Sequence, residues 1–116
     1  MSVYDDLAWR GLVNQVSDEA AVREYMSAPE ASLYCGFDPT AKSLHVGNLV
    51  PLLSLARCRR AGLAPLFLLG GATGLIGDPS GKDKERELLT QDKLFEQADF
   101  IERQVNAFFE RNTGRP

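Results

Sequence analysis

Two segments of the chain combine glycine with residue types that could bind a phosphate or a small substrate. In the first, His45 lies two residues before Gly47, where a helix is predicted to begin. A helix N-terminus presents unpaired N–H groups and a partial positive charge, which suit a phosphate, and glycine lets a nucleotide approach the backbone closely. The pattern indicates a phosphate contact, although a single histidine more often serves only as a helix cap.

The second segment, residues 70–82, is rich in glycine, at a cost in backbone entropy that a plain connector would avoid. Within it Asp78 stands between Gly77 and Pro79, so its carboxylate could be held facing a ligand ammonium group. Taken alone, the same residue is more typical of a turn. The phosphate loop Gly-x-x-x-x-Gly-Lys-Ser/Thr does not occur, because an aspartate follows Lys82. A nucleoside triphosphatase is therefore disfavoured.

Lys82 and Arg86 lie in a run of alternating basic and acidic residues, 82–87. Such a run usually forms a solvated surface. The functional interpretation is that these two side chains close over a polyphosphate.

The elements that must position these segments form a strand–helix–strand pattern. Short apolar runs at 31–36 and 64–69 predict two buried strands, and a helix is expected between them at about 48–61, ending at Gly62. Pro51 is compatible with this helix only in its first turn. One right-handed βαβ unit results. Ligands bind beyond the carboxyl ends of parallel strands, where both segments emerge.

Helices are predicted on either side of this unit. The first begins after Ser2 and ends near residues 11–14, and the second covers about 18–26 with Ser17 as its cap. A long amphipathic helix, 91–110, follows Thr90 and precedes a frayed tail at 112–116. Its predicted inner face consists of Leu94, Phe95, Ala98, Ile101, Val105 and Phe108.

The expected organisation is a helical lead-in at 1–30, the βαβ unit with its two segments at 31–82, and a loop with the long helix at 83–116. Two apolar parallel strands need neighbours and cover on both faces. The fold class is therefore predicted to be α/β, an incomplete Rossmann-like nucleotide-binding fold, in a chain that stops before its domain is complete.

Composition limits the other classes of function. Acidic residues outnumber basic ones, 16 to 13, for a formal charge of -3 over 116 residues, which argues against an autonomous nucleic-acid-binding surface. Cys35 and Cys58 match no metal spacing and are expected to be reduced thiols. No signal peptide or membrane-spanning stretch is apparent. A cytoplasmic protein that does not bind membranes is expected.

Three stretches together resemble the bacterial-type tyrosyl-tRNA synthetases, over residues 4–109: LYCGFDPTA at 33–41, SLHVGN at 43–48, and GGATGLIGDPS at 70–80. The tetrad at 45–48 is similar to the His-Ile-Gly-His signature of class I synthetases, although His-x-Gly motifs also occur in nucleotidylyltransferases. Asn48 stands where the second histidine is commoner, but its side-chain amide can still donate a hydrogen bond.

The resemblance implies that the chain carries the front part of a catalytic domain that activates tyrosine with ATP. Tyr34 would bind the substrate's phenol hydroxyl and Asp78 its ammonium group. Thr40, His45 and Asn48 would donate to the phosphates of ATP, and Lys82 and Arg86 would engage the leaving pyrophosphate. Three residues would shape the adenylate pocket: Gly36, Asp38 and Gly47. Mg²⁺ would be carried by ATP oxygens rather than by a protein cage.

The family also implies a homodimer and a tRNA(Tyr) partner, but the mobile Lys-Met-Ser-Lys-Ser-like loop, most of the dimer interface and the RNA-binding domain are not found in this sequence. Transfer to tRNA is accordingly expected of a full-length protein and not of this chain alone. Two alternatives remain: a catalytically inactive truncated fragment, and a different nucleotidylyltransferase with a His-x-Gly motif.

Overall fold

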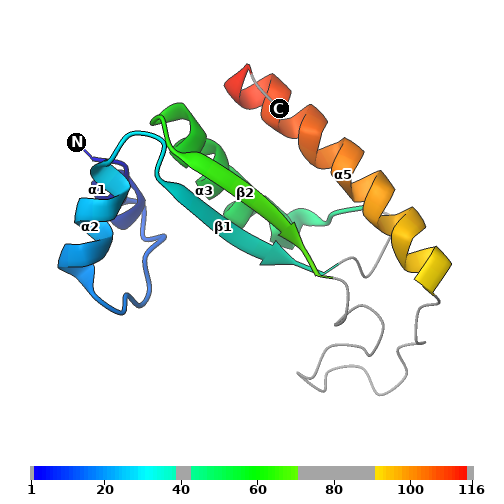
Figure 1. Ribbon diagram of the computed structural model, residues 1–116, viewed down its shortest axis with the longest axis horizontal. Helices are drawn as coiled ribbons and strands as arrows, with labels where there is room; N and C mark the ends of the chain where they lie inside the picture. The colour runs from blue at the N-terminus through cyan, green and yellow to red at the C-terminus, as the bar shows by residue number, and fades with distance from the viewer. Residues whose placement is uncertain (1, 39–42, 71–90, 115–116) are drawn as a thin grey trace. The chain divides into compact units, whose positions relative to one another are not determined.

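The computed structural model describes residues 2–38, 43–70 and 91–114. Its elements follow one another in the order helix, helix, strand, helix, strand, helix (Figure 1). In chain order they are α1 (Val3–Trp9), α2 (Glu19–Ser27), β1 (Ser32–Phe37), the 3-10 turn η1 (Val46–Asn48), α3 (Leu49–Arg60), β2 (Ala64–Leu69) and α5 (Gln91–Thr113).

The chain divides into two compact units. The first unit contains Met1–Cys35 and Leu49–Leu66, and the second contains Gly36–Asn48 and Phe67–Pro116. β1 and β2 form a two-stranded parallel sheet, as the strand–helix–strand pattern predicted. The α/β class is therefore confirmed.

In the first unit, α1 packs against α2 and α3. Ser2 caps α1 as predicted, since its hydroxyl accepts the Asp5 N–H at 3.1 Å. The predicted cap of α2 was wrong by one residue: the Asp18 carboxylate, and not Ser17, accepts the Ala21 N–H at 3.0 Å. Both residue types suit the position, and only the backbone geometry selects between them.

The core of the first unit gathers around one face of β1 and the end of α3. Its buried members are Ala31, Cys58 and Leu63, and partly buried hydrophobic side chains pack against them: Val3, Leu7, Met26 and Leu33. Cys58 is 1% exposed. The helices and the strand are therefore held together by a small apolar cluster, to which each contributes one or two residues.

The prediction of two fully buried strands was wrong. Burial alternates along β1, and large apolar side chains stand exposed on both strands, among them Tyr34, Leu66 and Leu68. An alternating pattern is typical of a sheet with one uncovered face. The apolar composition therefore overstates how much of the sheet is covered in this chain.

α3 begins and ends as the sequence predicted. Pro51 occupies its first turn, where the missing N–H costs nothing. At the other end Gly62 has φ +94, and the Leu63 N–H donates to the Cys58 carbonyl at 3.0 Å. Arg57, Arg59 and Arg60 lie in the last turn, which suits the partial negative charge there.

α5, in the second unit, ends at Thr113 rather than at residue 110, so the predicted frayed tail is helical up to that residue. Its last turn is stabilised by side chains: Asn112 Nδ2 donates to the Phe108 carbonyl at 2.8 Å and Thr113 Oγ1 to the Phe109 carbonyl at 2.7 Å. The Gly114 N–H, at φ +72, then bonds the Glu110 carbonyl.

The predicted inner face of α5 is confirmed for Ile101 and Val105 and wrong for Phe95. Gln97, Ile101, Val105 and Phe109 are buried at a spacing of four residues, whereas Phe95 is 62% exposed. Phe108 is only partly buried and meets the Phe109 ring edge-on at 5.9 Å. The periodicity identified a helix with an apolar face, but large apolar residues such as Phe95 and Phe108 also stand beside the buried row. Packing decides between them.

Candidate functional site

The segment before α3 is a tight turn built by three hydrogen bonds among its own residues. The His45 N–H donates to Asn48 Oδ1 at 3.0 Å, the Gly47 N–H donates to His45 Nδ1 at 3.1 Å, and the Asn48 N–H donates to the His45 carbonyl at 2.9 Å. All of these residues belong to the second unit. His45 and Asn48, predicted to donate to the phosphates, and Gly47, predicted to shape the adenylate pocket, thus form one hydrogen-bonded turn.

The Gly47 bond determines which ring nitrogen of His45 can act. Because Nδ1 accepts a hydrogen bond, the neutral imidazole carries its proton on Nε2. His45 is exposed, so this Nε2–H can reach a ligand. Asn48 is arranged in the same way: its oxygen accepts from the backbone, and its NH₂ group keeps two donors. Each of the two side chains therefore keeps a donor that is not used within the turn.

Gly47 is required here by a close approach. A Cβ atom at this position would lie 2.9 Å from both Cε1 and Nδ1 of His45. Any larger residue would push the imidazole away from the position in which Nδ1 meets the Gly47 N–H. The glycine predicted to shape a nucleotide pocket is, in this structure, the residue that lets the histidine ring fold back onto the turn.

Gly36 and Asp38 lie at the carboxyl end of β1, where the two strands are tied together. The Phe37 and Phe67 rings stack with centroids 4.3 Å apart at 15°, and the Gly70 N–H donates to the Phe37 carbonyl at 2.7 Å. Stacked rings of this kind contribute about 0.5–1.5 kcal/mol beyond their buried area. The predicted pocket residues Gly36 and Asp38 are thus attached to a locally fixed strand end, and Asp38 is exposed.

One residue that sequence reasoning missed supports this segment. Gln104 of α5 accepts the Leu44 N–H through its Oε1 at 2.8 Å, 60 residues along the chain. A glutamine on the exposed face of a long helix carries no local signal of such a contact. It holds the backbone directly ahead of His45.

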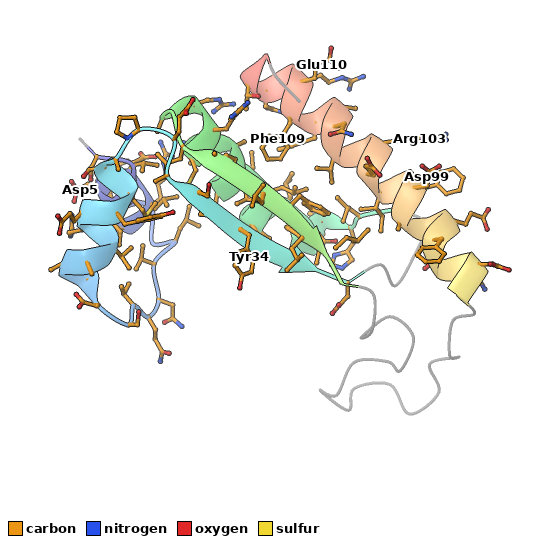
Figure 2. The ribbon with its side chains drawn as sticks, in the orientation of Figure 1. Asp5, Tyr34, Asp99, Arg103, Phe109 and Glu110 are labelled. Carbon is orange, nitrogen blue, oxygen red and sulfur yellow. The ribbon has the colours of Figure 1, made fainter. Side chains whose placement is uncertain are left out.

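Tyr34 belongs to the first unit. Its side chain projects outward from β1 (Figure 2) and is 70% exposed. Tyr34 is therefore not a core residue in this structure. The ring is available for a ligand.

Four predicted site residues, Thr40, Asp78, Lys82 and Arg86, lie outside the described residues. Within the described ranges, no group of three or more His, Cys, Asp or Glu side chains could hold a metal ion. In the same ranges, no helix is long and apolar enough to cross a membrane.

Cys35 and Cys58 are both free thiols, as predicted. Desolvation by burial raises the pKa of each thiol above its usual value of 9.0. Neither therefore has the lowered pKa typical of a cysteine nucleophile.

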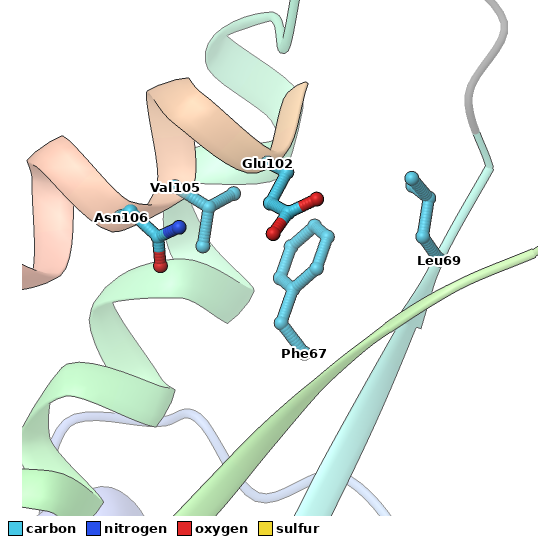
Figure 3. A pocket seen from close by; sticks show the side chains of 5 residues that line it. All are labelled: Phe67, Leu69, Glu102, Val105 and Asn106. Atoms are coloured by element: carbon cyan, nitrogen blue, oxygen red, sulfur yellow. The ribbon is translucent and has the colours of Figure 1, made fainter. Parts of the chain in front are cut away.

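A separate pocket of ≈ 300 Å³ lies between β2 residues and α5 in the second unit (Figure 3). Phe67, Leu69 and Val105 form apolar walls, and Glu102 and Asn106 add polar atoms at one side. It shares no residue with the turn at 45–48 or with the predicted site, so we do not assign it to the same function.

Comparison with known proteins identifies one family. Residues 26–113 match the family model described as tRNA synthetases class I (W and Y). A tyrosine–tRNA ligase of Rhodopirellula baltica is 49% identical over 109 residues, which cover 94% of this chain and 25% of that protein. A tyrosine–tRNA ligase of Klebsiella pneumoniae is 55% identical over 105 residues, covering 90% and 25%.

Solved structures agree with the sequence comparison. The crystal structure of a C-terminally truncated mitochondrial tyrosyl-tRNA synthetase of Coccidioides posadasii matches with a TM-score of 0.76 and 33% identity, covering 96% of this chain and 30% of that one. The chain thus spans about a quarter of the length of the curated relatives it matches.

Proposed function

Because the chain belongs to the class I (W and Y) tRNA synthetase family, we propose that it forms the ATP- and tyrosine-binding front of the catalytic region of a tyrosine–tRNA ligase. One observation carries the choice of substrate: relatives 44–55% identical over at least 90% of this chain are tyrosine–tRNA ligases. The turn at 45–48, whose two side chains keep donors that are not used within it, supports the ATP half of the proposal.

The proposed reaction is adenylate formation. A carboxylate oxygen of tyrosine attacks the α-phosphorus of ATP, the bond from that phosphorus to the bridging oxygen breaks, and pyrophosphate leaves with the bonding electrons. The carboxylate is already ionised at neutral pH, so no general base is needed. Catalysis then depends on positioning and on donors aimed at the phosphate charge.

The described residues of the second unit fit the phosphate part of this reaction. The His45 Nε2–H and the Asn48 NH₂ group donate to phosphate oxygens, and Gly47 keeps the histidine in place. Removing one such donor typically lowers kcat by about 10²–10³. We propose the same function for Thr40, and we assign Lys82 and Arg86 to the departing pyrophosphate. Mg²⁺ would come with ATP and supply further charge neutralisation.

We assign the binding of tyrosine to residues of β1 and of the segments that follow β1 and β2 in the sequence. Tyr34 would bind the phenol hydroxyl, Asp78 the ammonium group, and Gly36 and Asp38 would border the adenylate. A site that hydrogen-bonds a substrate hydroxyl rejects the analogue lacking it, because its own polar group is left unpaired. The exposed ring of Tyr34 supports this assignment.

Transfer to tRNA(Tyr) and assembly as a homodimer are proposed for the full-length protein of which this sequence would be a part. We also propose a cytoplasmic location, which two free thiols support. Some structural relatives are mitochondrial synthetases.

The test is ATP–pyrophosphate exchange in a hybrid in which residues 2–114 replace the matching quarter of the Klebsiella pneumoniae ligase. Tyrosine should support exchange, and phenylalanine or no amino acid should not. A folded hybrid that exchanges without tyrosine, or not at all, would count against the proposal. Adenylate transfer to a different substrate would favour the nucleotidylyltransferase alternative. Exchange by the chain alone would exclude the alternative of an inactive fragment.

A further inference from the structure

The hydroxyl of Tyr25 binds both backbone groups of one residue at the start of β1. It donates to the Ser32 carbonyl at 2.9 Å and accepts the Ser32 N–H at 3.1 Å. Both residues lie in the first unit. A single side-chain hydroxyl thus provides the donor and the acceptor that a neighbouring strand would otherwise provide.

These two hydrogen bonds between the Tyr25 hydroxyl and the Ser32 backbone, here called the clamp, lie on the edge of β1 that faces away from β2. The Ala64 N–H donates to the Ala31 carbonyl, and the Gly70 N–H donates to the Phe37 carbonyl. The backbone N–H and C=O groups of the odd-numbered residues of β1 therefore point toward β2. Because the backbone groups of successive residues point to opposite edges, those of Ser32 and Tyr34 both point to the outer edge. Among the residues whose backbone points that way, Ser32, which Tyr25 holds, is the last before Tyr34.

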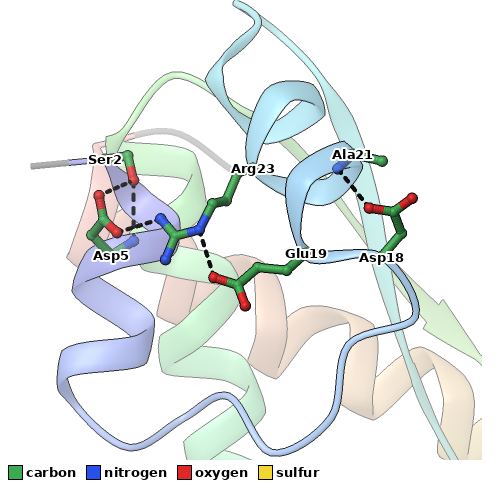
Figure 4. A network of polar contacts seen from close by, with 6 residues as sticks. All are labelled: Ser2, Asp5, Asp18, Glu19, Ala21 and Arg23. Carbon is green, nitrogen blue, oxygen red and sulfur yellow. Dashed lines mark hydrogen bonds and ion pairs between the residues drawn. The ribbon is translucent and has the colours of Figure 1, made fainter.

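The clamp is itself anchored to the N-terminal helix. Arg23, two residues before Tyr25, pairs with Asp5 of α1 and with Glu19 of α2 (Figure 4). Its guanidinium carbon lies 4.2 Å from the centroid of the Tyr4 ring. α2 is thus attached at one point to α1 and at another to β1. Movement of Ser32 would require breaking one of these attachments.

We infer that Tyr25 is a positioning residue for Tyr34: by holding both backbone groups of Ser32, it fixes the stretch of β1 that presents the Tyr34 hydroxyl to the phenol of the substrate. This inference rests on the proposed function. Tyr34 lies two residues beyond the clamp, about 6.6 Å along the strand, and its side chain projects from the same face as that of Ser32. Tyr25 touches no substrate in this proposal.

The hydroxyl can be tested apart from the ring. Tyr25 is 53% exposed, so Tyr25→Phe keeps the small buried area of the ring and removes only the two hydrogen bonds. Ser32→Ala is the matched control, because the clamp uses the Ser32 backbone and not its side chain. Hydrogen exchange on the chain reports the clamp directly: the Ser32 amide should exchange faster in Tyr25→Phe and at the parent rate in Ser32→Ala.

The functional measurement is the ratio of kcat/KM for tyrosine to that for phenylalanine, by ATP–pyrophosphate exchange in the hybrid enzyme. Loss of the clamp should lower this ratio about two- to tenfold in Tyr25→Phe, the range that follows from losing a typical hydrogen bond's net contribution. The KM for ATP should stay unchanged. Simple destabilisation reduces the active fraction for both amino acids equally and cannot move the ratio.

The outcomes separate the inference from the function on which it rests. If the unsubstituted hybrid shows no tyrosine-dependent exchange, the proposed function fails and the inference fails with it. If that exchange is present and Tyr25→Phe frees the Ser32 amide without changing the ratio, the positioning role is overturned while the function stands. An equal fall in Ser32→Ala would show that the backbone clamp is not the cause.

Discussion

At the scale of the residue, the turn at 45–48 gives each polar atom of two side chains a separate use. One nitrogen of His45 and the oxygen of Asn48 accept hydrogen bonds from backbone N–H groups inside the turn. The remaining nitrogen of each side chain is a donor that these two bonds do not use. A histidine can accept through one ring nitrogen and donate through the other, and the amide of Asn48 provides the same two functions through its oxygen and its nitrogen. Asparagine is therefore a workable second donor at this position.

Asn48→Asp separates the two uses of this side chain. The carboxylate keeps an acceptor for the His45 N–H, so stability should be unchanged, but it has no donor and brings negative charge toward the phosphates. We expect exchange in the hybrid to fall about 10²–10³-fold. Circular dichroism and the thermal midpoint provide the stability control. Activity equal to that of the parent would show that the amide does not donate to ATP.

Gly47→Ala tests the close approach of the imidazole. Its Cβ would meet the His45 ring at 2.9 Å, which displaces the ring and misdirects Nε2, so exchange should fall by about 10²-fold, as for loss of one donor. Val46→Ala is the neighbouring control, because that side chain is 85% exposed. Equal activity of the two variants would mean that the position of the ring is not used.

At the scale of the element, the first unit depends on cross-links between short helices. α1 has seven residues and α2 has nine, lengths at which isolated helices are marginal in water. Arg23 joins them through Asp5, and Arg57 of α3 approaches Asp6 at 3.6 Å. These ion pairs fix the orientation of the helices relative to one another, because apolar contacts alone are non-directional.

The Asp5–Arg23 pair should make stability depend on acid pH. The hydrogen bond from Arg23 lowers the pKa of the Asp5 carboxyl below its usual value of 3.8. The folded state therefore favours the charged form of Asp5. The contribution of this pair to the free energy of unfolding is present above the pKa that Asp5 has in the unfolded state, and it is lost as the pH falls through the pKa that Asp5 has in the folded state. In urea unfolding of the chain between pH 7 and pH 2, Asp5→Asn should flatten this acid dependence.

Asp99→Asn is the control for this measurement, since Asp99 pairs with Arg103 within one helix and links no second element. A curve for Asp5→Asn that matches the parent at every pH would contradict the assignment. So would an equal flattening in the control.

At the scale of the whole molecule, apolar side chains of β2 stand exposed on the sheet. Leu66 is 58% and Leu68 is 52% exposed, although parallel strands in α/β proteins are covered on both faces. The chain spans about a quarter of its curated relatives, and we expect the additional sequence in a full-length protein to cover these side chains.

Replacing both leucines with threonine should therefore act differently in two contexts. In the chain alone, each exposed substitution should change the free energy of unfolding by about 0.5 kcal/mol or less. In the hybrid, burial of each leucine would contribute about 1.5–3 kcal/mol, and the double variant should lose several times more stability than in the chain. Denaturant midpoints in both contexts provide the comparison. Equal losses would mean that the face stays uncovered.

The sequence by itself determined the local elements and the motifs attached to them. β2 was predicted at its observed bounds, and Pro51 and Gly62 marked the start and end of α3, because turn residues and helix ends act over a few bonds. The motif at 45–48 was likewise readable, since its hydrogen bonds span at most three residues.

Only the tertiary structure decided which apolar faces are covered and which distant residues meet. It chose Phe109 over Phe95 for the buried stripe of α5, exposed Tyr34, and brought Gln104 to Leu44 and Tyr25 to Ser32. Each of these outcomes depends on contacts between different elements, or on whether a covering layer exists. Residue type and periodicity describe what a face can bury, and the packing of other elements determines whether it does.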